Sequence, residues 1–324
     1  MNIWYELTPV DTLFFRGAEA MEAGLLGTGA LFPPPVSVVL GALRSAVVRQ
    51  SGSSFTDYNT GNCPSKLIEM IGESGAEAPF SVSALLLQKN GVLYGPCPAH
   101  WFAPGIGNST PSLSCATAAP IQAESNSTVA AALDLHSSSG SDMLPFAKGD
   151  RDLTSLGANW LRLALLGTGP TMLQPGDLLP PPSFYEREVR TGIGLDGTRK
   201  VVEGRLYSAE HIRLHHDVSI VIGIDRDIGL AETGTLFFGG ERRVCGYAKV
   251  SAPELPSQPA ERYMALAPVQ VTATMLADVF CAPRPVTLAG WDLDAGFHKP
   301  TSSWLPAGSV FSAEVATCCV PLPS

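Results

Sequence analysis

Three histidines of the segment HIRLHH form the chain's histidine cluster: His211, His215 and His216. Imidazoles that converge with carboxylates can act as general acids and bases or bind a metal ion. His211 and His215 share a face on a helix and also on a strand, so their spacing does not choose between the two. A solvated surface position is the more common use of such a cluster, and we expect that one here.

Aspartate pairs are the next candidates for chemistry. Three Asp-x-Asp pairs occur: Asp150/Asp152, Asp225/Asp227 and Asp292/Asp294. On a strand the two carboxylates of a pair lie on one face, where they could hold a divalent cation. Loops and turns use aspartate more often, for hydrogen bonds to nearby backbone amides. We therefore predict turns at these pairs and no metal site.

The common nucleotide-binding and hydrolase signatures receive no support from the sequence. None of the six lysines follows a glycine, as a P-loop requires, and no GxGxxG fingerprint follows a predicted strand. The nearest match to a serine-hydrolase elbow, over 72–76, lacks its final glycine and follows a helical segment rather than a strand. We expect no cofactor.

Two segments carry patterns that suit RNA. Arginine pairs with phosphates through two parallel hydrogen bonds and stacks on bases. The segment CGYAKV, 245–250, matches four positions of the RNP1 signature of RNA-recognition motifs, although a buried strand would show the same pattern. The more credible feature is a basic segment over 187–205, which could equally be a solvated charge run. It holds five of the chain's 21 lysines and arginines: Arg187, Arg190, Arg199, Lys200 and Arg205.

The elements that must position these residues follow from hydrophobic periodicity. Ile3, Tyr5 and Leu7 alternate, which predicts a strand over 2–8. Helical spacing predicts a helix over 38–49, approached through the prolines at 33–35 and capped by Ser37. Glycines and charges over 180–217 indicate a hairpin or extended arm. A long loop or insertion is expected over about 103–147, which is rich in serine and alanine.

The remaining elements make the C-terminal third rich in β-structure. Strands are predicted over 219–226, 234–238, 243–250 and 262–269, with closing strands over 285–291 and 309–315. Helices are predicted over 155–166 and 271–280. This pattern indicates an α+β fold with helices on a sheet.

Composition limits the class of protein. The chain has 324 residues, a formal net charge of −9 and a pI near 5.1, which argues against a free-standing nucleic-acid binder. Its 45% hydrophobic and 16% charged residues indicate a globular chain rather than a disordered one. Seven cysteines without a CxxC pair suggest neither a disulfide framework nor a zinc ribbon. Residues 23–43 lack charge, but the prolines at 33–35 break any spanning helix. We expect a cytoplasmic protein with no membrane segment.

Five motifs follow one another along the chain. The first is the strand exit TPVDTLFFR, followed by LFPPPVSVVLGALRSAVV. Then come LYGPCPAHWFAP near 93–104, EREVRTGIGLD at 186–196, GRLYSAEHIRL at 204–214 and the run GWDLDAGFHKPTSSWLPAGSVF at 290–311. In this order they resemble the third-subunit family of type III-B (Cmr) CRISPR effector complexes, a branch of the RAMP superfamily. The insertion over 105–150 is the main stretch without a counterpart.

The resemblance implies a non-catalytic assembly subunit with two ferredoxin-like (RRM-like) domains. The first would span 1–180 and carry the insertion; the second would span 181–324, with the basic arm over 181–217 at its start. Such subunits bind and cap the 5′ handle of a CRISPR RNA. Their implied partners are that RNA, the large polymerase/cyclase-type subunit and the backbone RAMP subunit.

The resemblance also suggests which residues touch RNA. Backbone phosphates would be bound by Arg16, Arg44 and the basic residues of 187–205, and a phosphate could lie at the helix start near Ser37. His298 and Trp304 could stack on splayed bases. The C-terminal run would supply glycines for close backbone approach and one more cation: Gly290, Gly296, Gly308 and Lys299.

Two other functions stay open at this point. A RAMP endoribonuclease would cut CRISPR RNA, with His211, His215 or His216 as general base. A small-molecule enzyme or binding protein with an α+β sandwich fold would carry no RNA. If the chain is instead the handle-binding subunit, we expect it to bind RNA weakly when isolated, with a steep dependence on salt, because only a local face is basic.

Overall fold

The computed structural model describes residues 2–16, 29–104, 121–122, 124–126, 144–148, 153–169, 172–289, 291–292, 297–298 and 300–323. It is mostly antiparallel sheet with few helices, which confirms the α+β class. The chain divides into two compact units of three segments each. The first comprises Met1–Val82, Phe184–Ser251 and Thr287–Ser302, and the second comprises Ser83–Ser183, Ala252–Val286 and Ser303–Ser324.

These units differ from the two consecutive domains, 1–180 and 181–324, that the family resemblance implies. The difference has a physical cause in strand β1 (Ile3–Pro9), which is hydrogen-bonded on both edges to later strands. Leu7 lies opposite Ile220 of β13 (Val218–Ile224) and Tyr247 of β15 (Val244–Val250). The N-terminal strand therefore completes its sheet with residues more than 200 positions away.

The sheet of the first unit has the strand order β13-β1-β15-β14, with every neighbouring pair antiparallel. All seven residues of β13 are buried, whereas β14 (Thr233–Phe237) is exposed except at Leu236. The predicted strands at 2–8, 219–226, 234–238 and 243–250 are confirmed. Long, regularly alternating or continuous apolar runs made these strands recognisable.

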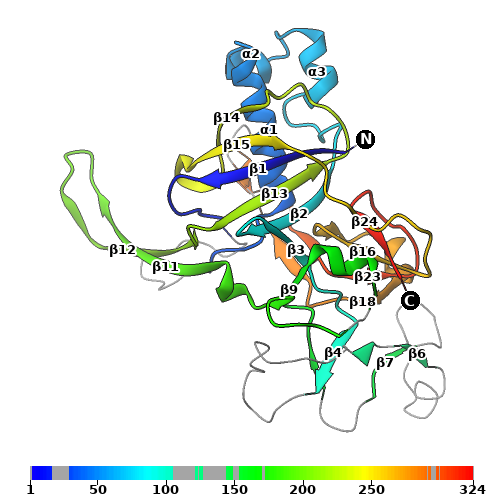
Figure 1. The fold of residues 1–324 in the computed structure, drawn as a ribbon. Helices are drawn as coiled ribbons and strands as arrows, with labels where there is room; N and C mark the ends of the chain where they lie inside the picture. The colour runs from blue at the N-terminus through cyan, green and yellow to red at the C-terminus, as the bar shows by residue number, and fades with distance from the viewer. Residues whose placement is uncertain are drawn as a thin grey trace. The chain divides into compact units, whose positions relative to one another are not determined.

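The long helix of the first unit is α1 (Val36–Gln50), and it buries Val39, Leu43 and Val47. Figure 1 shows α1 leading to the short helices α2 (Phe55–Asn59) and α3 (Ser65–Ile71) at its upper end. The helix is confirmed, but the capping prediction is wrong. The N-cap residue is Pro35, and Ser37 lies inside the helix with its side chain exposed. The helix begins earlier because proline suits the start of a helix, where its missing N–H costs no hydrogen bond within the helix.

A two-stranded ribbon projects from the first unit (Figure 1). It is formed by β11 (Tyr185–Leu195) and β12 (Val201–Leu214), paired antiparallel from Tyr185 opposite Leu214 to Leu195 opposite Val201. The turn between them is closed by Asp196, whose carboxylate accepts the backbone N–H groups of Thr198 and Lys200. The predicted hairpin is confirmed. The first unit also contains the short hairpin β20 (Trp291–Asp292) and β21 (Phe297–His298).

The strands of the second unit are short except for β2 (Val82–Lys89). Next to β2 follow, in hydrogen-bonded order, β3 (Val92–Pro96), β9 (Trp160–Arg162) and β10 (Leu178–Leu179). A second sheet has the order β18 (Val279–Cys281), β23 (Val310–Phe311), β16 (Arg262–Ala265) and β24 (Cys319–Leu322). β17 (Val269–Gln270) pairs with β22 (Ser302–Leu305). The predicted strands at 262–269, 285–291 and 309–315 are present but shorter: they correspond to β16, to β19 (Val286–Leu288) and to β23.

Two helix predictions fail here. The segment 155–166 forms the end of β8 (Leu153–Ser155), a turn, β9 and the 3₁₀ helix η2 (Leu163–Gly167). The turn is fixed at Gly157, where a Cβ would lie 2.9 Å from the Cα of Ala99, and β9 then pairs with β3. The segment 271–280 forms only the 3₁₀ helix η5 (Met275–Asp278), followed at once by β18.

The predicted loop at 103–147 lies mostly outside the described residues. Its described parts are short strands: the end of β4 (Trp101–Pro104), then β5 (Ile121–Gln122), β6 (Glu124–Asn126) and β7 (Leu144–Phe146). The six cysteines that the structure describes are free thiols. No helix in the described part of the chain is both long and apolar enough to cross a bilayer.

Candidate nucleic-acid interface

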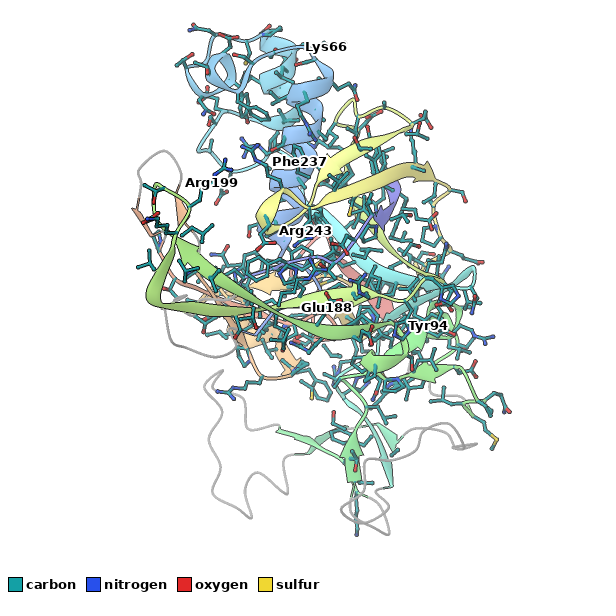
Figure 2. The ribbon with its side chains drawn as sticks, turned by 90° about the vertical axis from the view of Figure 1, so that its left-hand side faces the viewer. Lys66, Tyr94, Glu188, Arg199, Phe237 and Arg243 are labelled. Atoms are coloured by element: carbon teal, nitrogen blue, oxygen red, sulfur yellow. The ribbon has the colours of Figure 1, made fainter. Side chains whose placement is uncertain are left out.

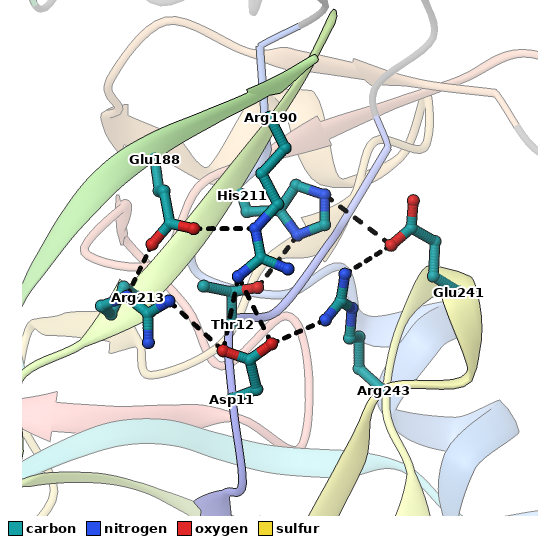
Figure 3. A network of polar contacts seen from close by, with 8 residues as sticks. All are labelled: Asp11, Thr12, Glu188, Arg190, His211, Arg213, Glu241 and Arg243. Carbon is teal, nitrogen blue, oxygen red and sulfur yellow. Dashed lines mark hydrogen bonds and ion pairs between the residues drawn. The ribbon is translucent and has the colours of Figure 1, made fainter. Parts of the chain in front are cut away.

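The root of the ribbon carries a network of charged side chains that joins three of the sequence motifs (Figure 3). Asp11 follows β1 and belongs to the motif TPVDTLFFR. Arg190 lies on β11 in EREVR, and Arg213 lies on β12 in HIRL. Three motifs that lie far apart in the sequence therefore meet at one carboxylate.

Asp11 is bonded to three arginines from three segments. Its Oδ2 lies 3.3 Å from Nη2 of Arg190 and 2.8 Å from Nη1 of Arg243, which precedes β15. Its Oδ1 lies 3.3 Å from Nη2 of Arg213. The backbone N–H of Thr12 and then the guanidinium groups of Arg190 and Arg213 hold the pKa of Asp11 below its ordinary value. Asp11 is therefore a carboxylate throughout the physiological range.

Glu188 bridges the two ribbon strands at the same place. Its Oε1 lies 2.7 Å from Nε of Arg190, and its Oε2 lies 2.6 Å from Nε of Arg213. These hydrogen bonds lower the pKa of Glu188 to about 2 and raise the pKa of both arginines. Each pair is roughly one-third exposed, so a single pair contributes about 0–1 kcal/mol.

His211 forms the buried edge of the network. Its side chain is 1% exposed, its Nδ1 lies 3.1 Å from Oγ1 of Thr12, and its ring stacks on Phe14 at 5.0 Å. Nε2 of His211 lies 3.8 Å from Oε2 of Glu241, which in turn pairs with Arg243 at 2.5 Å. Burial lowers the pKa of His211. The expectation of a solvated position is wrong for His211, because strand β12 turns this residue inward.

Backbone bonds and a second ion pair also hold the ribbon. The amides of Leu13 and Ile212 donate to each other's carbonyl oxygens, both at 2.8 Å. Arg187 pairs with Glu210 across the ribbon and donates to the carbonyl oxygen of Ala30 at 3.0 Å. The root is therefore fixed to the segments that follow β1 by neutral as well as charged contacts.

The tip of the ribbon differs from its root. Arg199 and Lys200 are exposed, and within the described residues neither side chain has an ion-pair partner. Figure 2 shows Arg199 at the far end of the ribbon, away from Glu188 and Arg243. Between root and tip the ribbon exposes four apolar side chains: Val189, Ile193, Leu195 and Val201. The arrangement can present two cations to an anion at a distance from the body of the unit.

A model of the CRISPR-associated protein family Cas_Cmr3 matches residues 5–277, most of the chain and all of the ribbon. The chain belongs to this family. Membership confirms the resemblance seen in the motifs and the class of a type III CRISPR effector subunit. No curated protein matches the chain.

Two solved structures contain chains that resemble this Cas_Cmr3 member in fold. Both are described as the Type III-B Cmr-beta complex bound to cognate target RNA, one of them also with AMPPnP. The chain in the AMPPnP complex is 19% identical, with a TM-score of 0.53 over 95% of this chain and 85% of that one. The other is 19% identical, with a TM-score of 0.56 over 96% and 87%.

Not all the arginines that the sequence singled out are available to a ligand. Arg44 donates to the hydroxyl of Tyr58, to the carbonyl oxygen of Ala76 at 3.0 Å and to that of Glu73. It therefore ties α1 to the α2–α3 segment. Arg16 is exposed and forms an isolated bridge with Ala30. The side chain of Arg205 lies outside the described part of the structure.

The C-terminal candidates are divided by the structure. Gly290, Gly296 and Lys299 lie outside the described residues, as does the side chain of His298. Trp304 is half-buried on β22. Gly308 is buried in the second unit: its N–H donates to Ala265, its C=O accepts from Ala99, and a Cβ would lie 2.7 Å from the carbonyl oxygen of Cys97. Packing and a backbone φ of +91° explain why this residue is a glycine, without any contact to RNA.

The RNP1-like segment is a core strand. Tyr247 of β15 is only 8% exposed and packs edge-on against Tyr5, with ring centroids 6.0 Å apart. An RNP1 strand needs exposed aromatic rings for bases to stack on. That reading of 245–250 is therefore wrong, and the alternative of a buried strand is confirmed.

Where the structure describes them, the metal-ligand candidates accept backbone hydrogen bonds. Asp227 accepts the N–H of Gly229 at 2.8 Å within a local turn, whereas Asp225 accepts that of Ser81, 144 positions away, at 2.9 Å. Among the described residues there is no group of three or more potential ligands. Asp150, Asp152 and Asp294, and the side chain of Asp292, are outside the described part.

Sequence patterns did not predict the acidic half of the network, nor the part that Arg243 plays in it. Glu241 belongs to none of the motifs, and Asp11 and Glu188 stood only inside the motifs that carry the resemblance. The available signal was the alternation of charge in EREVR, since residues 188 and 190 share a face of a strand. Pairing with Asp11 and Arg243 depends on tertiary structure and left no local trace.

Proposed function

We propose that this Cas_Cmr3 member is a non-catalytic subunit that binds and caps the 5′ handle of a CRISPR RNA within a type III effector complex. It would dock beside the large polymerase/cyclase-type subunit and the backbone RAMP subunit, in the cytoplasm. Both units would then be divergent ferredoxin-like domains. The four antiparallel strands β13, β1, β15 and β14 and the helix α1 support this for the first unit, whereas the described part of the second contains no α-helix.

The ribbon carries the proposal. Its root is held by neutralised charges, whereas Arg199 and Lys200 at its tip are exposed and have no carboxylate partner among the side chains that the structure describes. Cations without an internal partner are the ones that can release counterions from an RNA backbone. The carboxylate of the turn itself, that of Asp196, accepts backbone amides of the turn. We therefore assign RNA contact to Arg199 and Lys200 first.

The experiment reverses both tip charges, Arg199→Glu and Lys200→Glu, in the chain co-expressed with its partner subunits and a CRISPR RNA. We expect the assembly to form but to retain at least several-fold less guide RNA, measured by quantitative extraction from the purified complex, because two phosphate contacts become repulsive. The matched control is Lys66→Glu with Arg226→Glu, two exposed cations of the same unit. Unchanged guide RNA in the tip variant would contradict the proposal.

A further inference from the structure

Asp11 lies where a phosphate would otherwise be expected. Three guanidinium groups, those of Arg190, Arg213 and Arg243, converge on its two oxygens at 2.8–3.4 Å. Guanidinium groups bind a carboxylate and a phosphate with the same donors and similar geometry. Whichever anion holds these arginines excludes the other.

The charges of the network balance. Its three arginines face three carboxylates, those of Asp11, Glu188 and Glu241, all in contact with at least one of them. Asp11 is the one acid bonded to all three. Removing its charge would leave three guanidinium groups with two carboxylates and would weaken the charged links between the ribbon and the loop after β1.

We propose that Asp11 is a positioning and specificity residue that acts as an internal counter-ion. It fixes the direction of the ribbon and keeps Arg190, Arg213 and Arg243 from binding RNA phosphates indiscriminately, so that RNA meets the ribbon tip. The part that concerns the tip rests on the proposed function. The part that concerns the arginines does not, because any single-stranded RNA would compete for them.

Several hydrogen bonds at the root of the ribbon do not depend on Asp11. The reciprocal backbone bonds of Leu13 and Ile212 and the bond from Arg187 to Ala30 do not involve this carboxylate. Asp11 is itself 43% exposed, so its loss leaves no buried cavity. The fold should persist while the root of the ribbon loosens.

The test compares Asp11→Asn with Glu232→Gln in the isolated full-length chain. Glu232 is an exposed acid of the same unit whose pair with Lys249, at 3.0 Å, lies outside the network, so both variants lose one charge and release at least one cation. Binding of a fluorescently labelled oligouridine is followed by anisotropy across a salt series. We expect Asp11→Asn to bind at low salt at least about threefold more tightly than Glu232→Gln. Its salt slope should be steeper by up to about 1.4, since it frees up to three guanidinium groups against one ammonium group and each added phosphate contact contributes roughly 0.7.

A second readout reports position. Amide hydrogen exchange over 187–191 and 208–213 should accelerate in Asp11→Asn and return to the wild-type rate in Asp11→Glu, which restores the charge. Equal RNA affinity and slope in Asp11→Asn and Glu232→Gln, or unchanged exchange at the root, would overturn the inference. Failure of the proposed function looks different: the assembly would keep its guide RNA after reversal of the tip charges, while the Asp11→Asn effects on the isolated chain would remain.

Discussion

At the scale of single residues, a basic side chain is available to RNA only when no acid of the protein already pairs with it. The five basic residues of 187–205 look alike in the sequence, yet Arg187 and Arg190 are neutralised by acids, whereas no acid among the described side chains pairs with Arg199 or Lys200. The arginines could be named from the sequence because they cluster locally. Their neutralisation could not, because Asp11 is 179 positions from Arg190 and 232 from Arg243.

Gly308 provides a residue-scale test of packing against RNA contact. Its φ of +91° is unfavourable for alanine, and a Cβ would also meet the carbonyl oxygen of Cys97 at 2.7 Å. We expect Gly308→Ala to lower the free energy of unfolding by roughly 2 kcal/mol or more in urea titrations without any RNA.

The matched control is Gly176→Ala. Gly176 has nearly the same φ, +89°, but nothing lies within 4 Å of an added Cβ. It should therefore show the backbone cost alone and be the less destabilised of the two. Equal losses in both variants would show that the close approach to Cys97 has no energetic weight.

His100 provides a second residue-scale test, based on pH. Its side chain is 4% exposed and packs against Trp101 and Phe280; burial, together with the charge of Arg262, lowers its pKa to about 4 from an ordinary 6.5. Between those two pH values the unfolded chain binds a proton that the folded chain does not. The stability contributed by neutral His100 is thus complete above about pH 6.5 and is lost as the pH falls toward 4.

The loss should amount to roughly 3 kcal/mol, since each unit of pKa difference corresponds to about 1.4 kcal/mol. It is measured as the difference in pH dependence of urea unfolding between the wild-type chain and His100→Phe, which keeps an aromatic ring but cannot titrate. Any uniform cost of the substitution cancels in this comparison. Parallel pH profiles would show that His100 titrates normally in the folded protein.

At the scale of elements, prediction succeeded where a pattern is long and fails where contacts outweigh it. The ribbon, α1 and the strands β1, β13, β14 and β15 all have extended periodicity or strong turn residues. The segment 155–166 has apolar residues at helical spacing, but Gly157 must lie against Ala99 and β9 must pair with β3. Ser37 fails as a cap for a similar local reason, because Pro35 already starts the helix.

Each unit combines strands from distant segments of the chain, and local sequence patterns do not predict this interleaving. Two consecutive ferredoxin-like domains are the simplest division of 324 residues, yet β1 takes both neighbours from residues beyond 217. Strand pairing over such separations leaves no mark on local hydrophobic patterns. The same separation explains why motifs at 11, 190 and 213 look scattered in the chain and adjoin in the fold.

At the scale of the whole molecule, the net charge of −9 disfavours RNA binding because it repels phosphates, and only a local group of cations can offset this repulsion. The dependence of RNA affinity on salt concentration reports how many cations contact phosphates. If all five basic residues of 187–205 contacted phosphates, the slope of log affinity against log salt would be about −3.5, at roughly 0.7 per contact. If only Arg199 and Lys200 do so, it is about −1.4.

We expect the isolated wild-type chain to bind single-stranded RNA weakly, with a slope near the smaller value, because the root arginines are already paired. Anisotropy titrations of a labelled oligouridine over a range of salt concentrations measure it. Reversal of Arg199 and Lys200 should then abolish the remaining slope, whereas reversal of Lys66 and Arg226 should leave it unchanged. A wild-type slope near −3.5 would mean that RNA displaces the carboxylates of the root, and the ribbon would then bind along its length rather than at its tip.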